Sequence, residues 1–353
     1  MRNISDTIAR LTARASLPGL DHGGSAEDRL TDLSDFGGNP GALRARCYVP
    51  AGLRPGAALV VVLHGCTQTA AGYDHGSGWS RLADRHGFAL LFPEQQRANN
   101  PNLCFNWFVP GDTARGGGEP LSIRNMVARM VADHEIDPAR IFVTGLSAGG
   151  AMTAVMLAAY PDVFAGGAVI AGLPFGAAAT MPEAFDRMRG HGGPTRDELA
   201  ARARSAAPPA GSWPILSIWH GTADHTVAPG NADAIAAQWR DLHHLPDRPS
   251  NSDRIGAHTH RTWRDPNGRA VLEEYRIAGM GHGTPIDPGA GTDHGAPGAF
   301  MLDVGIASSH CILSFWGLQT DAPAVSAATP AAPAADPVSN VIANALRAAG
   351  LMS

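Results

Sequence analysis

The six residues Gly145–Gly150 limit the fold of this chain more than any other segment. They follow the apolar run Arg140–Thr144 and precede the helix-compatible run Ala151–Met156, which predicts a strand, a Gly-x-Ser-x-Gly turn and a helix in that order. In a chain with 42 glycines the pattern alone also occurs in Gly-rich turns, so the flanking runs decide. Ser147 is therefore predicted to lie on a tight, strained turn, with glycines on both sides that let strand and helix approach closely.

A serine in this context acts as a nucleophile that projects from the carboxyl edge of a sheet. The amide of Ala148, at the start of the helix, points to the place where an oxyanion would form. A second amide is expected from the loop His64–Gln68, which follows the apolar run Ala58–Leu63. We predict that the Cys66 amide donates together with Ala148. The His64 side chain is expected to hydrogen-bond this loop and fix its shape rather than to take part in catalysis.

Strand and helix patterns alternate along most of the chain. Continuous apolar runs predict central strands that are buried on both faces. This alternation indicates an α/β fold with a doubly wound, mostly parallel sheet. The predicted strands are Leu43–Val49, Ala58–Leu63, Phe88–Phe92, Gly166–Ala171, Ile215–Trp219 and Leu272–Ile277, and the predicted helices are Ser80–His86, Ser122–His134, Asn231–Trp239 and the mostly helical Phe300–Phe315.

Composition along the chain predicts its division into parts. Residues 1–40 are a short helix and a lead-in, 41–318 a catalytic domain, and 319–337 an Ala/Pro-rich linker. Within the domain, the Pro-rich segment 173–210 is predicted as a lid-like insertion over the carboxyl edge of the sheet, with a solvated connector as the alternative. The amphipathic segment 338–353 is predicted to be a helix that docks on its own chain, on a second copy in a homodimer, or on a polymer surface.

Two loops supply the acid and the base that a serine nucleophile needs. Asp224 ends a Gly turn after the strand Ile215–Trp219, and His282 lies between glycines after the strand Leu272–Ile277. The chain order Ser, Asp, His is the one expected for this fold class. Asp224 would hold the imidazole of His282 in the tautomer whose other nitrogen takes the serine proton.

Other residues of the same types lie nearby in the sequence. They are His220, His225, His294 and Asp233. His220 precedes the turn and is expected to pack against it or cap it, and His225 adjoins the acid, which places it poorly as the base. The remaining histidines, including His258 and His260, are expected on the surface.

Composition excludes several classes of function. The formal charge is -5 with scattered basic residues, which argues against nucleic-acid binding. No stretch reaches the ~18 apolar residues of a membrane span, and the charged stretch Met1–Leu11 lacks the apolar core of an export signal. No pair of histidines has the spacing of a metal site, so neither a metal nor another cofactor is expected.

Cysteine and aromatic positions leave two alternatives each. Cys66 and Cys104 follow neighbouring strands, so either a disulfide between them or buried thiols fits the spacing. Trp107 lies in the aromatic segment Asn102–Phe108, beside the predicted site. Its ring either forms an apolar wall that binds substrate or buries the loop itself.

Six motifs occur together and in a fixed order. With them the chain resembles the esterases of the polyhydroxybutyrate depolymerase family, in the α/β-hydrolase superfamily. The resemblance covers roughly residues 40–317, and feruloyl and acetylxylan esterases share parts of it. The motifs are His64–Gln68, Phe92–Gln95, Cys104–Phe108, the Ser147 turn, His220–Asp224 and Gly279–His282.

The resemblance implies a serine esterase with Ser147 as nucleophile, Asp224 as acid, His282 as base, and the Cys66 and Ala148 amides as oxyanion hole. It also implies a bridge between Cys66 and Cys104, an extracellular or periplasmic location, and poly(3-hydroxybutyrate) or its short oligomers as substrate. Feruloyl or acetyl esters of plant polysaccharide are the alternative substrates. A silent protein that binds granules or surfaces is disfavoured, because all three catalytic residue types are present.

Overall fold

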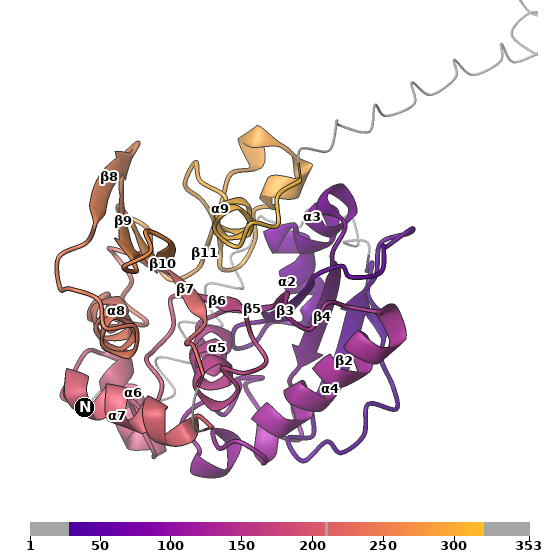
Figure 1. The fold of residues 1–353 in the computed structure, drawn as a ribbon, viewed down its shortest axis with the longest axis horizontal. Coiled ribbons are helices and arrows are strands. Elements are labelled where there is room, and N and C mark those ends of the chain that lie inside the picture. The colour runs from indigo at the N-terminus through magenta and orange to yellow at the C-terminus, as the bar shows by residue number, and fades with distance from the viewer. Residues whose placement is uncertain (1–27, 209–210, 321–353) are drawn as a thin grey trace, which may run out of the picture. The chain divides into compact units, whose positions relative to one another are not determined.

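The computed structural model describes residues 28–208 and 211–320, and these form a ten-stranded sheet flanked by helices (Figure 1). The strands are β1 (Thr31–Asp32), β2 (Arg44–Tyr48), β3 (Leu59–Leu63), β4 (Ala89–Glu94), β5 (Ile141–Leu146), β6 (Gly166–Ile170), β7 (Ile215–Gly221), β8 (Asn251–Ile255), β9 (His258–Arg264), β10 (Ala270–Ile277), β11 (Thr284–Ile286) and β12 (Met301–Asp303). The helices are α2 (Ala70–Ser77), α3 (Trp79–His86), α4 (Gly118–His134), α5 (Ala148–Ala159), α6 (Met181–Met188), α7 (Arg196–Ala206), α8 (Gly230–Leu242) and α9 (Ser308–Phe315), with short 3-10 turns η1 (Pro110–Asp112), η2 (Pro288–Ala290) and η3 (Thr292–His294).

The centre of the sheet is parallel. Strands β4, β3, β5, β6, β7 and β10 pair in parallel in this order, while β2 and β1 extend one edge and β9 and β8 the other in antiparallel pairing. Successive parallel strands are connected through helices, and these helices cover the faces of the sheet. The predicted α/β fold with a mostly parallel sheet is confirmed.

Strand register brings the loops that carry the predicted site residues to one edge of the sheet. Leu63 at the end of β3 pairs with Gly145 near the end of β5, and Ile277 at the end of β10 pairs with Gly221 at the end of β7. Since parallel strands with aligned register end together, the segments that follow them meet at the carboxyl edge of the sheet. The fold thereby gathers residues that are more than a hundred positions apart in the sequence.

The core lies on both faces of the central strands. Every residue of β3, β4, β5, β6 and β7 is buried, as their continuous apolar runs predict. Helix α5 is also buried at all of its positions, because it lies against the sheet and under neighbouring helices. The helix that carries the serine is therefore fixed by packing on every side.

Strands β8 and β9 were not predicted. All residues of β8 are exposed, so the segment lacks the apolar run that indicates a strand. Strand β9 places His258 and His260 against β10, where the amide of Ala278 donates to His258 Nδ1 at 3.2 Å and the His260 ring stacks on Tyr275 with 4.2 Å between centroids. The prediction that these histidines lie on the surface is wrong, because strand pairing buries His258 and partly buries His260.

The predicted insertion 173–210 contains helices α6 and α7. Gln238 of α8 donates to the Leu199 carbonyl at 2.8 Å, and this fixes α7 on α8. In the loop after β7, the Ala228 amide donates to the Met188 carbonyl at 2.7 Å. In the described part of the segment, α7 thus packs on α8, and the residue that ends α6 is hydrogen-bonded to the loop after β7.

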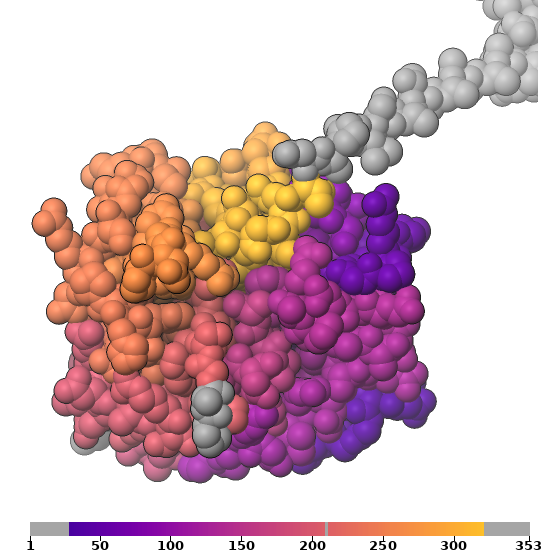
Figure 2. Space-filling model, in the orientation of Figure 1, coloured from indigo at the N-terminus to yellow at the C-terminus, as the bar shows by residue number. Residues whose placement is uncertain are grey.

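The last described segment returns across the domain. After β10, strands β11 and β12 form a small parallel sheet, and the amide of Ala296 donates to the Gly76 carbonyl of α2 at 2.9 Å. Figure 2 shows the surface of this segment in yellow between the orange β8–β10 region and the violet α2–α3 region. The loop that begins with the predicted base is thus anchored on a helix that follows β3.

Some predictions fall on other parts of the chain. Among the described residues, no helix is both long and apolar enough to cross a bilayer. The predicted amino-terminal helix, the linker beyond Thr320 and the helix at 338–353 lie outside the described residues. Of the predicted lead-in, residues 28–40 are described and contribute β1.

Replacing Gly149 with alanine tests how closely α5 approaches β3. A Cβ atom at Gly149 would lie 2.3 Å from the carbonyl oxygen of Leu63 and 2.5 Å from that of His64, so the backbone must shift. We expect Gly149→Ala to lower the free energy of unfolding by about 2 kcal/mol or more in urea denaturation. Gly230→Ala is the matched control, because a Cβ there has nothing within 4 Å. Equal losses in the two variants would contradict this packing argument.

Candidate active site

Ser147 lies in the turn between β5 and α5, with φ 58° and ψ -117°. Residues with a side chain rarely adopt positive φ, and such strain concentrates at functional sites. A Cβ atom at Gly145 would lie 2.5 Å from the backbone of Gly149, which confirms the predicted close approach of strand and helix. The Ser147 amide donates to the Ile170 carbonyl at 2.9 Å, and this bond holds the turn against β6.

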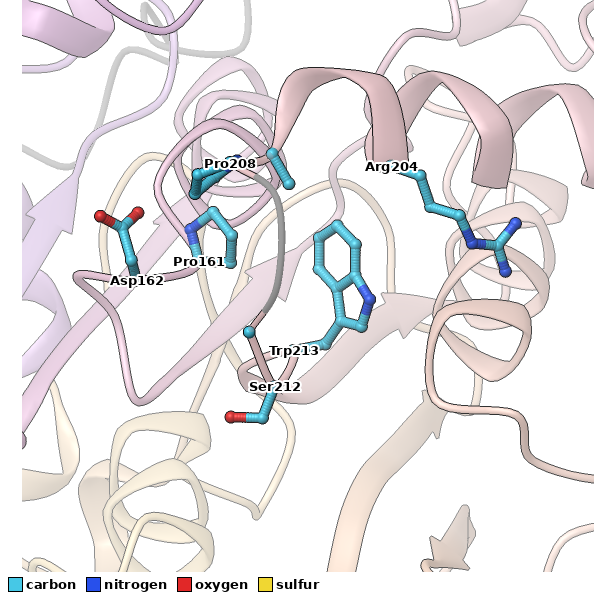
Figure 3. Close-up of a pocket in the computed structure, with 8 residues that line it drawn as sticks. Pro161, Asp162, Arg204, Pro208, Ser212 and Trp213 are labelled. Carbon is cyan, nitrogen blue, oxygen red and sulfur yellow. The ribbon is translucent and has the colours of Figure 1, made fainter.

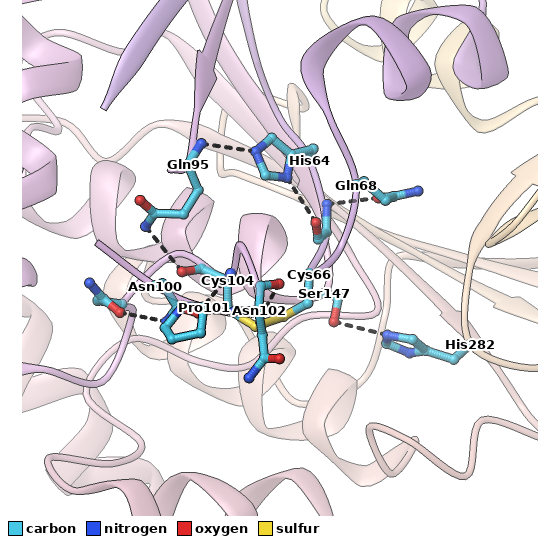
Figure 4. Close-up of a disulfide and its surroundings, with 12 residues drawn as sticks. His64, Cys66, Gln68, Gln95, Asn100, Pro101, Asn102, Cys104, Ser147 and His282 are labelled. Atoms are coloured by element: carbon cyan, nitrogen blue, oxygen red, sulfur yellow. Dashed lines mark hydrogen bonds between the residues drawn. A yellow bond between two sulfur atoms is a disulfide. The ribbon is translucent and has the colours of Figure 1, made fainter. Parts of the chain in front are cut away.

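The structure brings Ser147, His282 and Asp224 into one hydrogen-bonded chain. His282 Nε2 lies 2.9 Å from Ser147 Oγ (Figure 4), and His282 Nδ1 lies 2.7 Å from Asp224 Oδ2. The three side chains come from the loops after β5, β10 and β7. Asp224 is 2% exposed and His282 8%, so water has little access to the bond between them. In this arrangement a hydroxyl can pass its proton to an imidazole that a carboxylate orients.

The carboxylate of Asp224 is surrounded by N–H groups. Its Oδ1 accepts the amides of Thr226 at 2.8 Å and Val227 at 2.9 Å, and its Oδ2 accepts His282 Nδ1. Burial alone would raise the pKa of Asp224, but hydrogen bonds from His220 and His282 lower it below its ordinary value. The group is therefore ionised at neutral pH and can stabilise an imidazolium.

The competing residues lie elsewhere. His225 and Asp233 are exposed, and the His294 ring stacks on His310 with 3.7 Å between centroids. His220 is buried beside Asp224, with its Nε2 3.4 Å from Asp224 Oδ2, and its hydrogen bond goes to the Val227 carbonyl rather than to the serine. Of the residues considered for base and acid, His282 and Asp224 are the pair that joins Ser147.

Two backbone amides at the site are available to form an oxyanion hole. In the loop after β3, the amides of Gly65, Thr67 and Gln68 all donate within the protein, at 2.8, 2.8 and 3.3 Å. Among the described residues, the amides of Cys66 and Ala148 donate to no other group. Since β3 and β5 are neighbours with aligned ends, both amides lie at the edge that holds the serine. Free N–H groups at this place suit a developing oxyanion.

His64 holds the oxyanion loop. Its Nε2 accepts the Gln95 amide at 3.1 Å, so Nδ1 carries the proton that is donated to the Gly65 carbonyl at 2.8 Å (Figure 4). Burial lowers the pKa of His64, and the bond to Gly65 opposes this only in part, so the ring is neutral. The prediction that His64 fixes the shape of the loop is confirmed.

The structure contains a disulfide between Cys66 and Cys104, as the resemblance implied (Figure 4). Cys47 is a buried thiol and Cys311 a partly buried one. The bridge joins the oxyanion loop to the loop after β4, across a sequence separation of 38 residues. One end of the proposed oxyanion hole is thus tied covalently to a second loop.

Glu119, which was not predicted, organises the loop after β4. This fully buried side chain at the start of α4 accepts Gln95 Nε2 at 2.7 Å and the Asn106 amide at 2.9 Å. Burial raises the pKa of Glu119 to about 8, and the hydrogen bonds offset only part of that effect. The helix was predicted from its apolar face, but nothing in the local sequence shows which carboxylate turns inward.

Trp107 is 7% exposed and belongs to the hydrophobic core, with its ring edge-to-face against Phe108 at 5.3 Å between centroids. This position favours the interpretation that the indole buries its loop. Phe300, which was not predicted, lies beside the predicted base. Its ring is edge-to-face to that of His282, with 6.2 Å between centroids. Its φ of 63° is unusual for an aromatic residue. Phe300 is thus an apolar group beside the base.

A separate pocket of about 230 Å³ lies away from these residues (Figure 3). It is formed by the segments that follow α5 and α7 and the segment that leads into β7, with Trp213 at its side. Since Asp224 follows the opposite end of β7, this pocket lies at the amino edge of the sheet. It is therefore distinct from the candidate active site.

A cluster of possible ligands lies outside the site. The ligand atoms of Asp293, His294 and His310 lie within 4.8 Å of one another, a grouping that local spacing does not reveal. The Arg85 guanidinium lies 2.6 Å from Asp293 Oδ2, so a cation already balances this carboxylate. We assign the cluster to an ion pair that joins α3, η3 and α9.

The chain is similar to known esterases. The family described as "Esterase PHB depolymerase" matches residues 44–262. The chain is 49% identical over 295 residues to poly(3-hydroxyalkanoate) depolymerase C of Paucimonas lemoignei, covering 82% of this chain and 70% of the relative.

Other relatives carry different names. Feruloyl esterase B of Talaromyces stipitatus is 32% identical over 267 residues, covering 73% of each chain. The solved structure of an acetyl xylan esterase from Aspergillus awamori superposes with a TM-score of 0.70 at 26% identity, covering 82% of this chain and 99% of that one. The fold and the family therefore agree, while the named substrates differ among the relatives.

Removing the disulfide tests its hold on the oxyanion loop. For a sequence separation of 38 residues, chain entropy predicts that Cys104→Ser loses on the order of 4 kcal/mol of unfolding free energy. Urea denaturation with and without reductant measures this loss. We expect reductant to bring the parent to the level of Cys104→Ser and to leave the variant unchanged. A parent that is insensitive to reductant while its thiols titrate would contradict this account.

The buried Glu119 predicts a pH dependence of stability. Its pKa of about 8 in the fold exceeds the ordinary 4.5, so the folded state binds the proton more tightly and this contribution falls as pH rises from about 5 to 8. We expect the unfolding free energy of the parent to fall relative to Glu119→Gln over this range, in urea denaturation at both pH values. The exposed Glu135→Gln is the control. A constant difference between parent and Glu119→Gln would contradict the assignment.

Proposed function

The chain belongs to the family of polyhydroxybutyrate depolymerase esterases, and from this premise we propose that it hydrolyses poly(3-hydroxybutyrate) or short hydroxyalkanoate oligomers through an acyl-enzyme on Ser147. The observation that carries the proposal is the chain of hydrogen bonds from Ser147 through His282 to Asp224 at the carboxyl edge of the sheet. The 49% identity to a poly(3-hydroxyalkanoate) depolymerase supports the choice of substrate. Members of this family are carboxylic ester hydrolases.

Acylation begins when Ser147 Oγ attacks the ester carbonyl carbon. His282 Nε2, at 2.9 Å, takes the hydroxyl proton, and the resulting imidazolium is stabilised by the ionised Asp224. The carbonyl oxygen becomes an oxyanion that accepts hydrogen bonds from the Cys66 and Ala148 amides. Because these donors are fixed before the reaction, little reorganisation accompanies the new charge.

Collapse of the tetrahedral intermediate completes the cycle. The bond to the leaving alkoxide breaks, and His282 Nε2–H gives that oxygen its proton. A water molecule then attacks the acyl-enzyme while His282 takes its proton, and Ser147 leaves with that proton restored. The products are a hydroxy acid and an alcohol end, and every proton moves among the Ser147 hydroxyl, the substrate, water and the imidazole.

A second candidate keeps this chemistry and changes the ester. The likeness to a feruloyl esterase and to an acetyl xylan esterase favours feruloyl or acetyl esters of plant polysaccharide. The triad and the oxyanion hole act on the ester group alone, so they serve both substrate classes. The groups beside His282, such as Phe300, would have to distinguish the acyl and alcohol parts.

The test is acid release from amorphous poly(3-hydroxybutyrate) and from soluble hydroxybutyrate oligomers, with Ser147→Ala in parallel. We expect the parent to release acid and Ser147→Ala to lose roughly 10⁴-fold or more in turnover, as in dissected triads. The control Ser34→Ala changes an exposed serine remote from the triad in sequence and is expected to match the parent.

Each alternative result has a distinct meaning. Retention of most turnover by Ser147→Ala would show that the assigned nucleophile is wrong. Cleavage of oligomers without attack on polymer would restrict the substrate to short chains. Release from methyl ferulate or acetylated xylan alone, with none from hydroxybutyrate esters, would replace the first candidate by the second.

A further inference from the structure

His220 occupies a place that the mechanism above does not use. It is the last but one residue of β7, and its side chain is completely buried. Its Nε2 lies 2.9 Å from the Val227 carbonyl oxygen and 3.4 Å from Asp224 Oδ2. Both neighbours are acceptors, so Nε2 carries the proton and donates it to the Val227 carbonyl, with Asp224 Oδ2 as a more distant neighbour.

The other nitrogen of the ring has no such role. Within the part of the chain that the structure describes, His220 Nδ1 is buried and has no hydrogen-bond partner. An unpaired polar atom in the interior destabilises a fold, and an apolar ring of similar shape would avoid that penalty. A histidine at this position is therefore better explained by what its Nε2–H does than by its packing.

His220 holds the loop that carries the acid. Its Nε2–H donates to the carbonyl of Val227, and the amides of Val227 and Thr226 in turn donate to Asp224 Oδ1. Asp224 Oδ2 lies 2.7 Å from His282 Nδ1 and 3.4 Å from His220 Nε2. Without His220, the Val227 end of this loop would lose the side chain that holds it.

We propose that His220 is a positioning residue of the triad, whose Nε2–H holds the loop 224–227, and with it the carboxylate of Asp224, in the orientation that aligns His282. The proposal rests on the proposed triad but not on the choice between polyester and polysaccharide esters. Because the polar contacts of the His220 side chain are with the acid loop, we expect it to act on the rate of the chemical step rather than on substrate binding. Turnover should therefore change while KM does not.

The experiment compares His220→Phe with His220→Gln on a soluble ester, p-nitrophenyl butyrate. Phenylalanine keeps a planar ring without the N–H, whereas glutamine can present an amide N–H near the position of Nε2. We expect His220→Phe to lower kcat by about ten- to a hundredfold, less than the ~10⁴-fold expected when the orienting carboxylate itself is changed. In His220→Phe, KM should stay within about twofold of the parent and Tm should not fall. In His220→Gln, kcat should recover at least half of that loss on a logarithmic scale.

A double-variant cycle keeps the test decisive. If His220 acts through Asp224, His220→Phe has no further effect on kcat in an Asp224→Asn background, whereas independent effects would multiply. His243→Phe, in which a partly buried histidine facing the Pro214 carbonyl is replaced, is the control for the cost of adding a ring and should keep the parental kcat.

Three results would overturn the proposal. They are an unchanged kcat in His220→Phe, a rise in KM alone, and multiplicative effects in the cycle. Should His220→Phe fail to fold, the same cycle run with His220→Gln and His220→Leu decides between these outcomes. Failure of the triad assignment is recognised separately, because Asp224→Asn would then retain full activity.

Discussion

The close contact between the start of α5 and the end of β3 is the constraint on which the site depends. Gly149 lies so near the carbonyls of Leu63 and His64 that no side chain fits between them. This contact holds Ser147 in a backbone conformation that its side chain would otherwise disfavour. The same contact places the first residues of the oxyanion loop beside the nucleophile. One steric fit therefore sets the position of both the proposed nucleophile and the amides proposed to form the oxyanion hole.

Around this contact, buried polar groups hold the loops that packing cannot fix. His64 joins the oxyanion loop to Gln95, and Glu119 joins Gln95 to Asn106. Asp224 likewise joins two loops, because it accepts hydrogen bonds from Val227 in the loop after β7 and from His282 in the loop after β10. Loop backbone cannot satisfy its N–H groups by regular pairing, so buried carboxylates and imidazoles supply the missing acceptors. These buried polar groups lie at the carboxyl edge, where the loops of the candidate site meet.

The sequence was sufficient for features that depend on neighbouring residues. The serine turn, the central strands and the positions of Asp224 and His282 all follow from short motifs, because each needs a glycine turn after an apolar strand. Features that depend on distant partners were missed. Strand β8 has no apolar run, since its edge position leaves all its residues exposed. The burial of His258 follows from the pairing of its strand β9 with β10 and from its contacts with Ala278 and Val304. The inward turn of Glu119 likewise depends on Gln95 and Asn106, which lie elsewhere in the chain.

Substrate choice is not set by the groups that break the ester. Relatives named for polyhydroxyalkanoate, feruloyl and acetylxylan esters share this family or fold, and the proposed triad would act on the ester group that these substrates have in common. We therefore expect specificity to arise where the acyl and alcohol parts diverge from the reacting carbon. Phe300 is a candidate for this role, because its ring lies against His282, its backbone has a positive φ, and its carbonyl accepts the Thr284 amide at 2.8 Å. A strained aromatic residue that is fixed to the base loop can shape the substrate surface without altering the orientation of the triad, so selection of the ester and the mechanism of its cleavage can change independently.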